Sequence, residues 1–442
     1  MHKRAYATVV AASGAVALLV SGCGGGGSST GGSTGAAAPA TTSSTTTTAA
    51  ASPTTTGAPK RDANADLVIW TDADRAQAVT KYADAFGQEN GVTVAVQIST
   101  DVRQQFKDAT KVGQGPDVIV GAHDWLGELV QNATVAPINL SPDVTAKLAP
   151  NAVAATKFNG QTYGVPYAVE NIALMRNTAL APDAPTTMDQ LVAEGTKIKD
   201  ASGGKVTNVL IQQVGKTGNA YYSYPYLAAY GGGIFATKAN GDYDSTKLLV
   251  DSAGSLKGAA ELAKLGKSKV LSTNVGDDNA EALFDAGKAP FFITGPWAQT
   301  NAKKAGIKYA VSNLPSLAGG GPMEPFLGVQ MFYVSAKAKN PTIAQEFVTN
   351  YVTREDVQMA LFEATGRPPA LTTAYEKAAA EDPMVKAFYE AGKNGKPMPN
   401  IPAMNSVWGP LGQAAADVIS GADPTSRFTA AQKEIAANIA KG

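Results

Sequence analysis

The feature that most limits the fold of this chain is an alternation of apolar runs and amphipathic segments over residues 67–120. It begins with Leu67-Val68-Ile69-Trp70, a continuous apolar run of the kind found in strands that are covered on both faces. Residues 73–90 then carry an apolar stripe on one helical face and end at Asn90-Gly91, which is typical of a helix stop. The stripe consists of Val79, Tyr82, Ala83 and Phe86.

The alternation continues with a second strand at 92–98, a second helix at 101–112 and a third strand after Gly115-Pro116-Asp117. The order strand, helix, strand, helix, strand predicts an α/β fold built on an open, largely parallel sheet. Ligands of such sheets bind at the carboxyl ends of the strands, which places the expected site near residues 71–75 and 121–125.

The later part of the chain shows the same mixture of elements. Thr187 stands three residues before Gln190, a capping-box pattern that predicts a helix over 188–200, and Thr342 with Gln345 predicts another helix start. The remaining pattern predicts helices at 221–230, 255–266, 280–287 and 425–440, and strands at 209–213 and 289–294. No internal repeat of solenoid period occurs.

The first 62 residues differ in composition from the rest. A basic start and an apolar run from Ala5 to Val20 have the layout of a secretory signal, and the run is short for a spanning helix of roughly 20 residues. The pattern Val20-Ser21-Gly22-Cys23 resembles the bacterial lipobox, and Cys23 is the only cysteine, so it forms no internal disulfide. We therefore expect a signal peptide at 1–22 and a lipid on Cys23.

Residues 23–62 are then expected to form a disordered tether of Gly, Ser, Thr, Ala and Pro, because they carry too few apolar side chains to offset the entropy of ordering. Lipidation would hold the chain on the extracellular face of the cell membrane, and the lipid would be its only membrane contact. About 380 residues remain after the tether, which is more than one hydrophobic core usually supports, so we expect two domains.

Composition also excludes several classes of function. The 37 basic and 37 acidic side chains balance, so nothing favours a nucleic-acid partner. His123 is the only histidine after His2, and neither metal-ligand spacing nor a P-loop pattern occurs. We therefore expect no catalytic residues, no metal and no cofactor, and a chain that acts as a monomer.

A resemblance becomes visible when seven short motifs are taken in order along the body. They are Leu67-Val68-Ile69-Trp70, Gly115-Pro116-Asp117-Val118-Ile119, Ala122-His123-Asp124, Tyr163-Gly164-Val165-Pro166, Ala168-Val169-Glu170, Gly295-Pro296-Trp297 and Met398-Pro399-Asn400-Ile401-Pro402. From about residue 66 to the end, the chain resembles the maltose/maltodextrin-binding proteins of ABC importers.

The resemblance implies a two-lobed α/β fold of the periplasmic-binding-protein type II, in which each lobe is a mainly parallel sheet flanked by helices. Lobe one would comprise 66–168 plus 327–380 and lobe two 169–326 plus 381–442, joined by a multi-strand hinge. Maltose or a maltodextrin would bind in the cleft and close the lobes. The partners would be ABC permease subunits with a separate ATPase.

The resemblance also implies a set of sugar-binding residues, since a sugar needs aromatic platforms for its apolar face and planar polar groups for its hydroxyls. Asp74, Arg75 and Asp124 match residues that bind hydroxyls, and Glu170 matches the cleft glutamate beside the hinge. Tyr221, Trp297 and Trp408 match stacking aromatics. Trp125 and Asn219 complete the expected set of ligand-binding residues.

This sequence departs from the family pattern at several of these positions. Gly121 stands where the best-known members carry a tryptophan, so the aromatic has moved by four positions to Trp125. Asn219 replaces a glutamate, and Gly409 and Gly412 replace a tyrosine and an arginine. These changes leave the sugar length and linkage open.

Other interpretations of the same residues also stay open. Glu170 could form a structural ion pair, Asp124 could cap a helix, and each tryptophan could pack in a core. The fold could bind another solute, such as trehalose, a galactoside or an oligosaccharide-like inhibitor. The protein could also be a lipoprotein without a transport role, such as the sugar-binding partner of a sensor. A secreted glycosidase is the remote alternative, because it would need two facing carboxylates about 5–10 Å apart.

Overall fold

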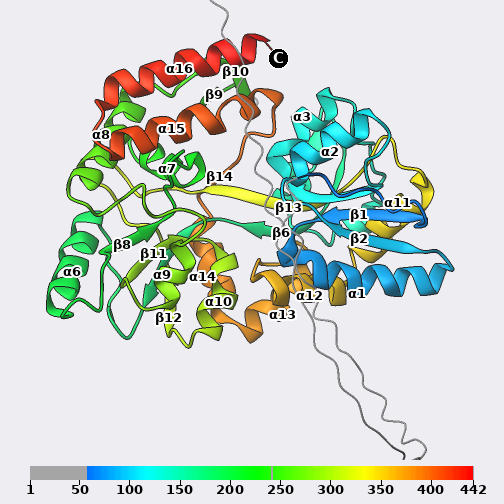
Figure 1. The fold of residues 1–442 in the computed structure, drawn as a ribbon, viewed down its shortest axis with the longest axis horizontal. Helices are drawn as coiled ribbons and strands as arrows, with labels where there is room; N and C mark the ends of the chain where they lie inside the picture. The colour runs from blue at the N-terminus through cyan, green and yellow to red at the C-terminus, as the bar shows by residue number, and fades with distance from the viewer. Residues whose placement is uncertain (1–56, 240–241, 442) are drawn as a thin grey trace, which may run out of the picture. The chain divides into compact units, whose positions relative to one another are not determined.

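The computed structural model describes residues 57–239 and 242–441, coloured by position in Figure 1. The expected signal peptide, Cys23 and most of the expected tether lie outside the described residues. Arg61, at the end of the expected tether, contacts the body through its guanidinium group, which donates to the Gly115 carbonyl (3.0 Å) and to Asp117 Oδ2 (2.7 Å). Contacts with the body therefore begin by residue 61.

The first sheet has six strands, with β13 at a branch point. β1 (Leu67–Thr71) pairs in parallel with β2 (Val94–Ile98) and β3 (Val118–Ala122). The long strand β13 (Phe326–Val334) runs antiparallel to β3 and to β6 (Gly164–Glu170) and pairs in parallel with the short β14 (Lys396–Pro397).

The second sheet has the strand order β12-β7-β11-β8. Its strands are β7 (Ala173–Asn177), β8 (Leu210–Gln212), β11 (Phe291–Thr294) and β12 (Tyr309–Ser312). β7 is antiparallel to both β11 and β12, and only β8 and β11 pair in parallel. The prediction of mainly parallel sheets is therefore wrong in this part of the molecule, because β7 runs on from β6 and is paired with strands that return along it.

Helices flank both sheets (Figure 1). Beside the first sheet lie α1 (Ala73–Asn90), α2 (Val102–Lys111), η1 (His123–Trp125), α3 (Leu126–Gln131), α4 (Pro142–Thr145), α5 (Pro150–Ala155), α11 (Pro341–Glu346), the π-helical turn η3 (Phe347–Tyr351), α12 (Glu355–Thr365) and α13 (Thr372–Glu381). The hairpin of β4 (Lys157–Phe158) and β5 (Gln161–Thr162) also lies in this part.

The elements associated with the second sheet come from three stretches of the chain. They are α6 (Met188–Ala201), α7 (Ala220–Ala228), β9 (Phe235–Thr237), β10 (Tyr243–Leu248), α8 (Ala253–Lys267), α9 (Ala280–Asp285), η2 (Pro296–Ala298), α10 (Gln299–Lys304), α14 (Pro383–Gly392), η4 (Pro402–Ser406), α15 (Trp408–Ile419) and α16 (Pro424–Lys441). Among the described residues, no helix is both long enough and apolar enough to cross a membrane.

The two predicted capping boxes have different outcomes. Thr187 accepts from the Gln190 backbone N–H, and the Gln190 side chain accepts in return, so the first prediction is confirmed. At the second position α11 begins at Pro341, two residues before the start that a Thr342 cap predicts, and Asn340 is the cap residue. The predicted Thr342 cap is therefore wrong, because the preset φ of Pro341 suits the first helical position and places Thr342 inside the first turn.

The apolar run at the start of the body explains the layered packing of the first sheet. Leu67 and Ile69 belong to the core beneath α1 and α12, whereas Val68 and Trp70 belong to the core on the opposite face. All four side chains are fully buried. This confirms a strand that is covered on both faces, and its carboxyl end leads directly into the site described next.

Candidate functional site

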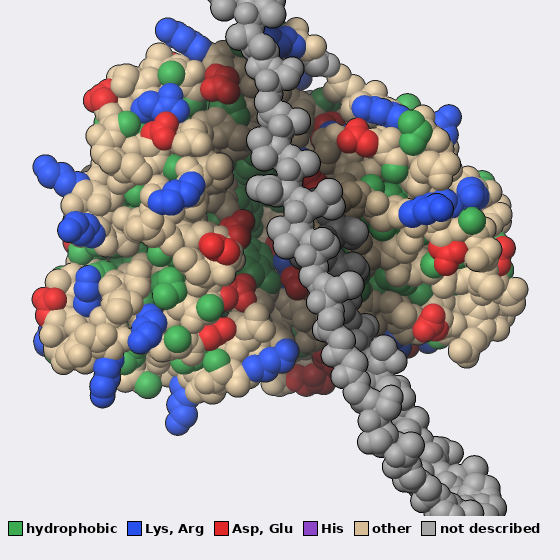
Figure 2. Space-filling view, in the orientation of Figure 1, with side chains coloured by type: hydrophobic (Ala, Val, Ile, Leu, Met, Phe, Trp, Pro, Cys, Tyr) green, Lys and Arg blue, Asp and Glu red, His purple; other side chains and the backbone are tan. Residues whose placement is uncertain are grey.

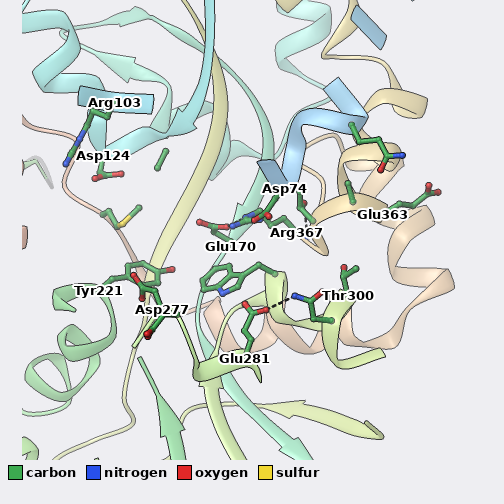
Figure 3. Close-up of a pocket in the computed structure, with 18 of the residues that line it drawn as sticks. Asp74, Arg103, Asp124, Glu170, Tyr221, Asp277, Glu281, Thr300, Glu363 and Arg367 are labelled. Atoms are coloured by element: carbon green, nitrogen blue, oxygen red, sulfur yellow. Dashed lines mark hydrogen bonds and ion pairs between the residues drawn. The ribbon is translucent and has the colours of Figure 1, made fainter. Parts of the chain in front are cut away.

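A cavity of about 970 Å³ opens between elements associated with the two sheets. Its lining residues come from α1, α2, β3, η1 and β6 on one side and from α7, α9, η2 and α10 on the other, together with the end of α12, the segment that follows it and the start of α15. Figure 2 shows several acidic side chains beside the hollow near the middle of this face. Figure 3 shows the polar side chains that converge on this space.

Seven of the nine residues predicted to bind the ligand line this cavity. They are Asp74, Asp124, Trp125, Glu170, Tyr221, Trp297 and Trp408. These residues come from six different elements, so the fold brings together side chains that are distant in the sequence. Whether they contact a ligand remains a prediction.

The other two predicted residues, Arg75 and Asn219, have partners inside the protein and do not line the cavity. The Arg75 side chain is 6% exposed and donates to Asp72, to the Tyr167 hydroxyl and to Gln330 Oε1, the last at 3.0 Å. Asn219 is the N-cap of α7, and its Oδ1 accepts from the Tyr221 backbone N–H at 3.1 Å. The Arg75 guanidinium group and the Asn219 amide oxygen are therefore engaged within the protein, and a ligand contact by either residue stays a prediction.

Two of the cavity tryptophans lie against glycines. A Cβ added to Gly121 would be 1.9 Å from the ring of Trp125, and a Cβ added to Gly295 would be 2.1 Å from the ring of Trp297. The Trp125 ring therefore occupies the space that a side chain at position 121 would need. This geometry agrees with the predicted displacement of the aromatic by four positions, and both rings are half-buried at the cavity wall.

Asp124 is a buried carboxylate with little compensation for its charge. It is 8% exposed, and its Oδ2 accepts a hydrogen bond from Trp408 Nε1 at 3.2 Å. Burial raises the pKa of Asp124 to about 6, although the positive charge of Arg103 and the Trp408 hydrogen bond oppose the shift. Asp124 does not cap a helix, since η1 has no side-chain cap.

Glu170 lies in the same cavity, but both of its oxygens are occupied. Oε1 accepts from Gln330 Nε2 at 2.8 Å, and Oε2 accepts from Arg367 Nε at 2.5 Å. The ion pair is almost enclosed, with the Arg367 side chain 11% exposed and the Glu170 side chain 8% exposed. The structural ion pair left open by the sequence is therefore present.

The sequence did not point to two further cations at the site. Arg103 lies on α2 with its guanidinium carbon 5.9 Å from the Trp125 ring centroid and its Nε 4.0 Å from Glu128 Oε2. Arg367 lies two residues after α12, with its guanidinium carbon 5.2 Å from the Trp297 ring centroid. Neither belongs to a recognisable motif, and only the Gly366 helix stop marks the place where the chain turns before Arg367.

The cavity lining is markedly acidic. Seven carboxylates face three cationic side chains, and three of the acids, Asp277, Asp278 and Glu281, lie in or just before α9. Burial raises the pKa of Glu281, opposed by the hydrogen bond from Asn301 and reinforced by the charge of Asp74. Within residues 57–239 and 242–441, no three His, Cys, Asp or Glu side chains are grouped as metal ligands.

His123 lies behind the cavity and is not part of its lining. Its Nδ1 accepts from the Val329 backbone N–H at 3.1 Å, so the proton resides on Nε2, which donates to the Met398 carbonyl at 3.1 Å. Burial lowers the pKa of His123 to about 4. The neutral ring thus connects η1, β13 and the segment that follows β14.

Comparison with known proteins identifies the family. The model of the bacterial extracellular solute-binding proteins matches residues 81–387. The chain belongs to this family. Its members bind solutes and are not enzymes, so the expectation that the chain has no catalytic function is confirmed.

Three curated relatives carry names that include their ligands. The galactooligosaccharide-binding protein of Bacillus subtilis is 29% identical over 403 residues, which cover 88% of this chain and 91% of that protein. The maltotriose-binding protein of Pyrococcus abyssi is 26% identical, covering 79% of this chain and 76% of its own length. The maltooligosaccharide ABC transporter solute-binding lipoprotein of Streptococcus pneumoniae is 28% identical, covering 80% and 84%.

Proposed function

We propose that this protein captures a neutral oligosaccharide in the cavity and delivers it to an ABC permease that works with a separate ATPase. The observation that carries the proposal is the presence of three half-buried tryptophans, Trp125, Trp297 and Trp408, among polar side chains in one cavity of about 970 Å³. Indole rings match the apolar faces of pyranose rings, and carboxylates and guanidinium groups match their hydroxyls.

The charge of the lining supports a neutral ligand. With seven carboxylates and three cations on the wall, an anionic sugar would meet repulsion in a site where water screens charges poorly. Glu170 already neutralises Arg367, which leaves even fewer cations for an acidic substituent. Uronic-acid oligosaccharides are therefore the class that this cavity should reject.

Two neutral series remain as candidates. The motifs around Trp297 and Trp408 favour maltodextrins, and the P. abyssi and S. pneumoniae relatives are named for maltotriose and maltooligosaccharides. The B. subtilis relative, which is 29% identical, is named for galactooligosaccharides. The two series differ in the orientation of one hydroxyl and in their linkage, so the polar groups beside each tryptophan should decide between them.

The remaining parts of the proposal concern organisation and location. We propose lobe one as 66–168 plus 327–380 and lobe two as 169–326 plus 381–442, closing on the sugar by a hinge motion. We also propose that a lipid on Cys23 holds the protein on the extracellular face of the cell membrane, and the S. pneumoniae relative is named a lipoprotein.

Calorimetric titration of the purified protein tests this function. The panel should contain maltose, maltotriose, maltotetraose, galactobiose, galactotriose and trehalose, with trigalacturonic acid as the anionic control. We expect micromolar or tighter binding to one neutral series, a change in tryptophan fluorescence, and no heat with the acid. Absence of binding to every neutral sugar would contradict the proposal.

A further inference from the structure

Arg367 is held rigidly at the wall of the cavity by its own loop. Gly366 adopts a left-handed conformation (φ 69°) at the end of α12, and a Cβ added there would be 2.3 Å from the Pro296 carbonyl oxygen. Gln299 Nε2 donates to the Gly366 carbonyl at 3.2 Å. The loop before Arg367 therefore packs tightly against the turn that carries Trp297, and only glycine fits at position 366.

A chain of hydrogen bonds holds the guanidinium group from behind. Arg75 Nη2 donates to Gln330 Oε1, Gln330 Nε2 donates to Glu170 Oε1, and Arg367 Nε donates to Glu170 Oε2. Glu170 is itself confined, because it stands opposite Gly328 in the β6–β13 ladder and a Cβ there would be 2.9 Å from its Cγ. The Glu170 carboxylate is thus held by hydrogen bonds at both oxygens while its Cγ lies close over Gly328.

Two donors beside Trp297 have no partner within the described part of the chain. They are the Nη1 group of Arg367 and the hydroxyl of Tyr221, and both atoms are buried. The Tyr221 ring centroid lies 6.5 Å from that of Trp297, and Arg367 lies over the same indole. A buried donor without a partner is costly, so both atoms favour a ligand that brings acceptor oxygens.

We propose that Arg367 is a specificity-determining residue that donates through Nη1 to a hydroxyl of the sugar unit at Trp297, and that Glu170 is its positioning residue. The family resemblance assigns the ligand contact to Glu170, whereas the geometry assigns it to Arg367. This inference rests on the proposed oligosaccharide function and refines it.

The charge state of the pair indicates which oxygen it takes. Glu170 compensates the charge of Arg367, so the pair is neutral as a unit and attracts a carboxylate far less than a free arginine does. Its free Nη1 still donates a directional, charge-assisted hydrogen bond. The subsite therefore suits a neutral hydroxyl, in agreement with the acidic lining around it.

The proposed hydrogen bond between Arg367 and a sugar hydroxyl can be tested by a double-mutant cycle, in which the second change is the removal of one hydroxyl from the sugar. Wild-type protein, Arg367→Met and the control Arg354→Met would be titrated with maltotriose and galactotriose and with the monodeoxy analogues of each. Arg354 is a suitable control because it pairs with Asp356 at 2.9 Å and does not line the cavity.

We expect Arg367→Met to lower affinity about tenfold or more. We also expect one deoxy analogue to bind about tenfold more weakly than its parent sugar to wild type and to the control, but equally well to Arg367→Met. If Arg367→Met does not fold because Glu170 loses its partner, the double variant Glu170→Gln/Arg367→Met, which removes both charges, takes its place in the cycle.

Glu170→Gln separates positioning from simple stability. If Glu170 positions Arg367, the penalty for the missing hydroxyl should shrink in this variant, and the Arg367 Nε–H resonance in ¹H–¹⁵N spectra should move. A purely structural Glu170 would lower Tm and leave the penalty unchanged, which would overturn its positioning role.

The remaining outcomes are also decisive. For each deoxy analogue, the loss of affinity relative to its parent sugar can be compared between Arg367→Met and wild type. If this loss is the same in both proteins for every analogue, Arg367 contacts no hydroxyl, and the inference is wrong while the proposed function stands. If wild type binds neither trisaccharide nor any other neutral sugar of the panel, the proposed function and this inference fail together.

Discussion

The cavity contains two buried carboxylates in opposite situations. Glu170 is locked by Arg367 and Gln330, so its charge is compensated within the protein. Asp124 has one hydrogen bond from Trp408, and burial raises its pKa to about 6. The comparison teaches that two acids which the resemblance places in one ligand site can differ in availability: Asp124 keeps acceptor capacity for a ligand, whereas both oxygens of Glu170 accept from Gln330 and Arg367.

The largest expected effect comes from removing the charge of Glu170, the carboxylate that is compensated within the protein. Glu170→Gln leaves the Arg367 charge buried without its partner, so we expect the free energy of unfolding to fall by about 3 kcal/mol. Chemical denaturation measures the change. Lys393→Met is the control, because Lys393 forms an exposed pair with Glu390 at 2.6 Å and should change stability little. An unchanged stability in Glu170→Gln would show that the pair is not the buried, coupled unit described above.

The next largest effect concerns Trp408, the tryptophan that donates a hydrogen bond to Asp124. Trp408→Ala should weaken oligosaccharide binding by about 2 kcal/mol, or roughly thirtyfold, because it removes a stacking face and the donor to Asp124. Trp408→Phe keeps most of the face and loses only the Nε1 donor, so its loss should be smaller. Both variants should keep a Tm near that of wild type.

Trp70 serves as the contrasting tryptophan. It is fully buried, donates through Nε1 to Gln97 at 3.0 Å, and does not line the cavity. Trp70→Phe should therefore lower Tm without changing the affinity of the folded fraction. If Trp408→Ala behaves like Trp70→Phe, Trp408 is a core residue and the proposed platform is wrong.

Asp124→Asn should have opposite effects on stability and binding. The folded protein holds the Asp124 proton up to about pH 6, whereas the unfolded chain releases it near 3.8. The folded state therefore loses stability as pH rises from about 4 to 6, and above pH 6 the full cost of the buried charge remains. Removing that charge should raise the free energy of unfolding by about 1–2 kcal/mol at neutral pH.

The same variant should lower affinity about tenfold at pH 7, because an amide oxygen accepts a sugar hydroxyl less strongly than a carboxylate does. In wild type the affinity should fall as pH drops below about 6, and in Asp124→Asn this dependence should vanish. Titrations at pH 5, 6 and 7 measure both. A wild-type affinity that is constant over this range would mean that the Asp124 charge does not contact the sugar.

Local patterns predicted most elements of the fold correctly. The apolar stripe at 73–90 coincides with α1, and the Thr187 capping box is present at the start of α6. The strand directions of the second sheet were predicted wrongly, because they depend on how β7 continues from β6 and receives β11 and β12 as antiparallel neighbours. Local periodicity carries no information about such distant pairings.

The site was also only partly predictable, because some of its residues are placed by contacts that are distant in the sequence. Asp74 and Arg75 are adjacent, but neighbours on a helix point about 100° apart, so one lines the cavity and the other enters the internal network. Arg367 could not be predicted from a motif, since its place depends on Gly366 packing against Pro296, seventy residues earlier in the chain. Motifs thus indicated the strand and helix ends of the site and missed the loop that completes it.

The smallest expected effect concerns Trp125, the residue next to Asp124, and the glycine against which its ring lies. Gly121→Ala would place a Cβ 1.9 Å from the Trp125 ring, so the indole must move away from the cavity wall. Position 121 lies inside β3, where alanine is tolerated by the backbone, so we expect a several-fold loss of affinity, about 1 kcal/mol, with little change in Tm. Calorimetry with Gly121→Ala, Trp125→Ala and the double variant measures this. If the glycine acts only by seating the indole, the double variant should bind as weakly as Trp125→Ala alone; additive losses would mean that Gly121 affects binding by another route.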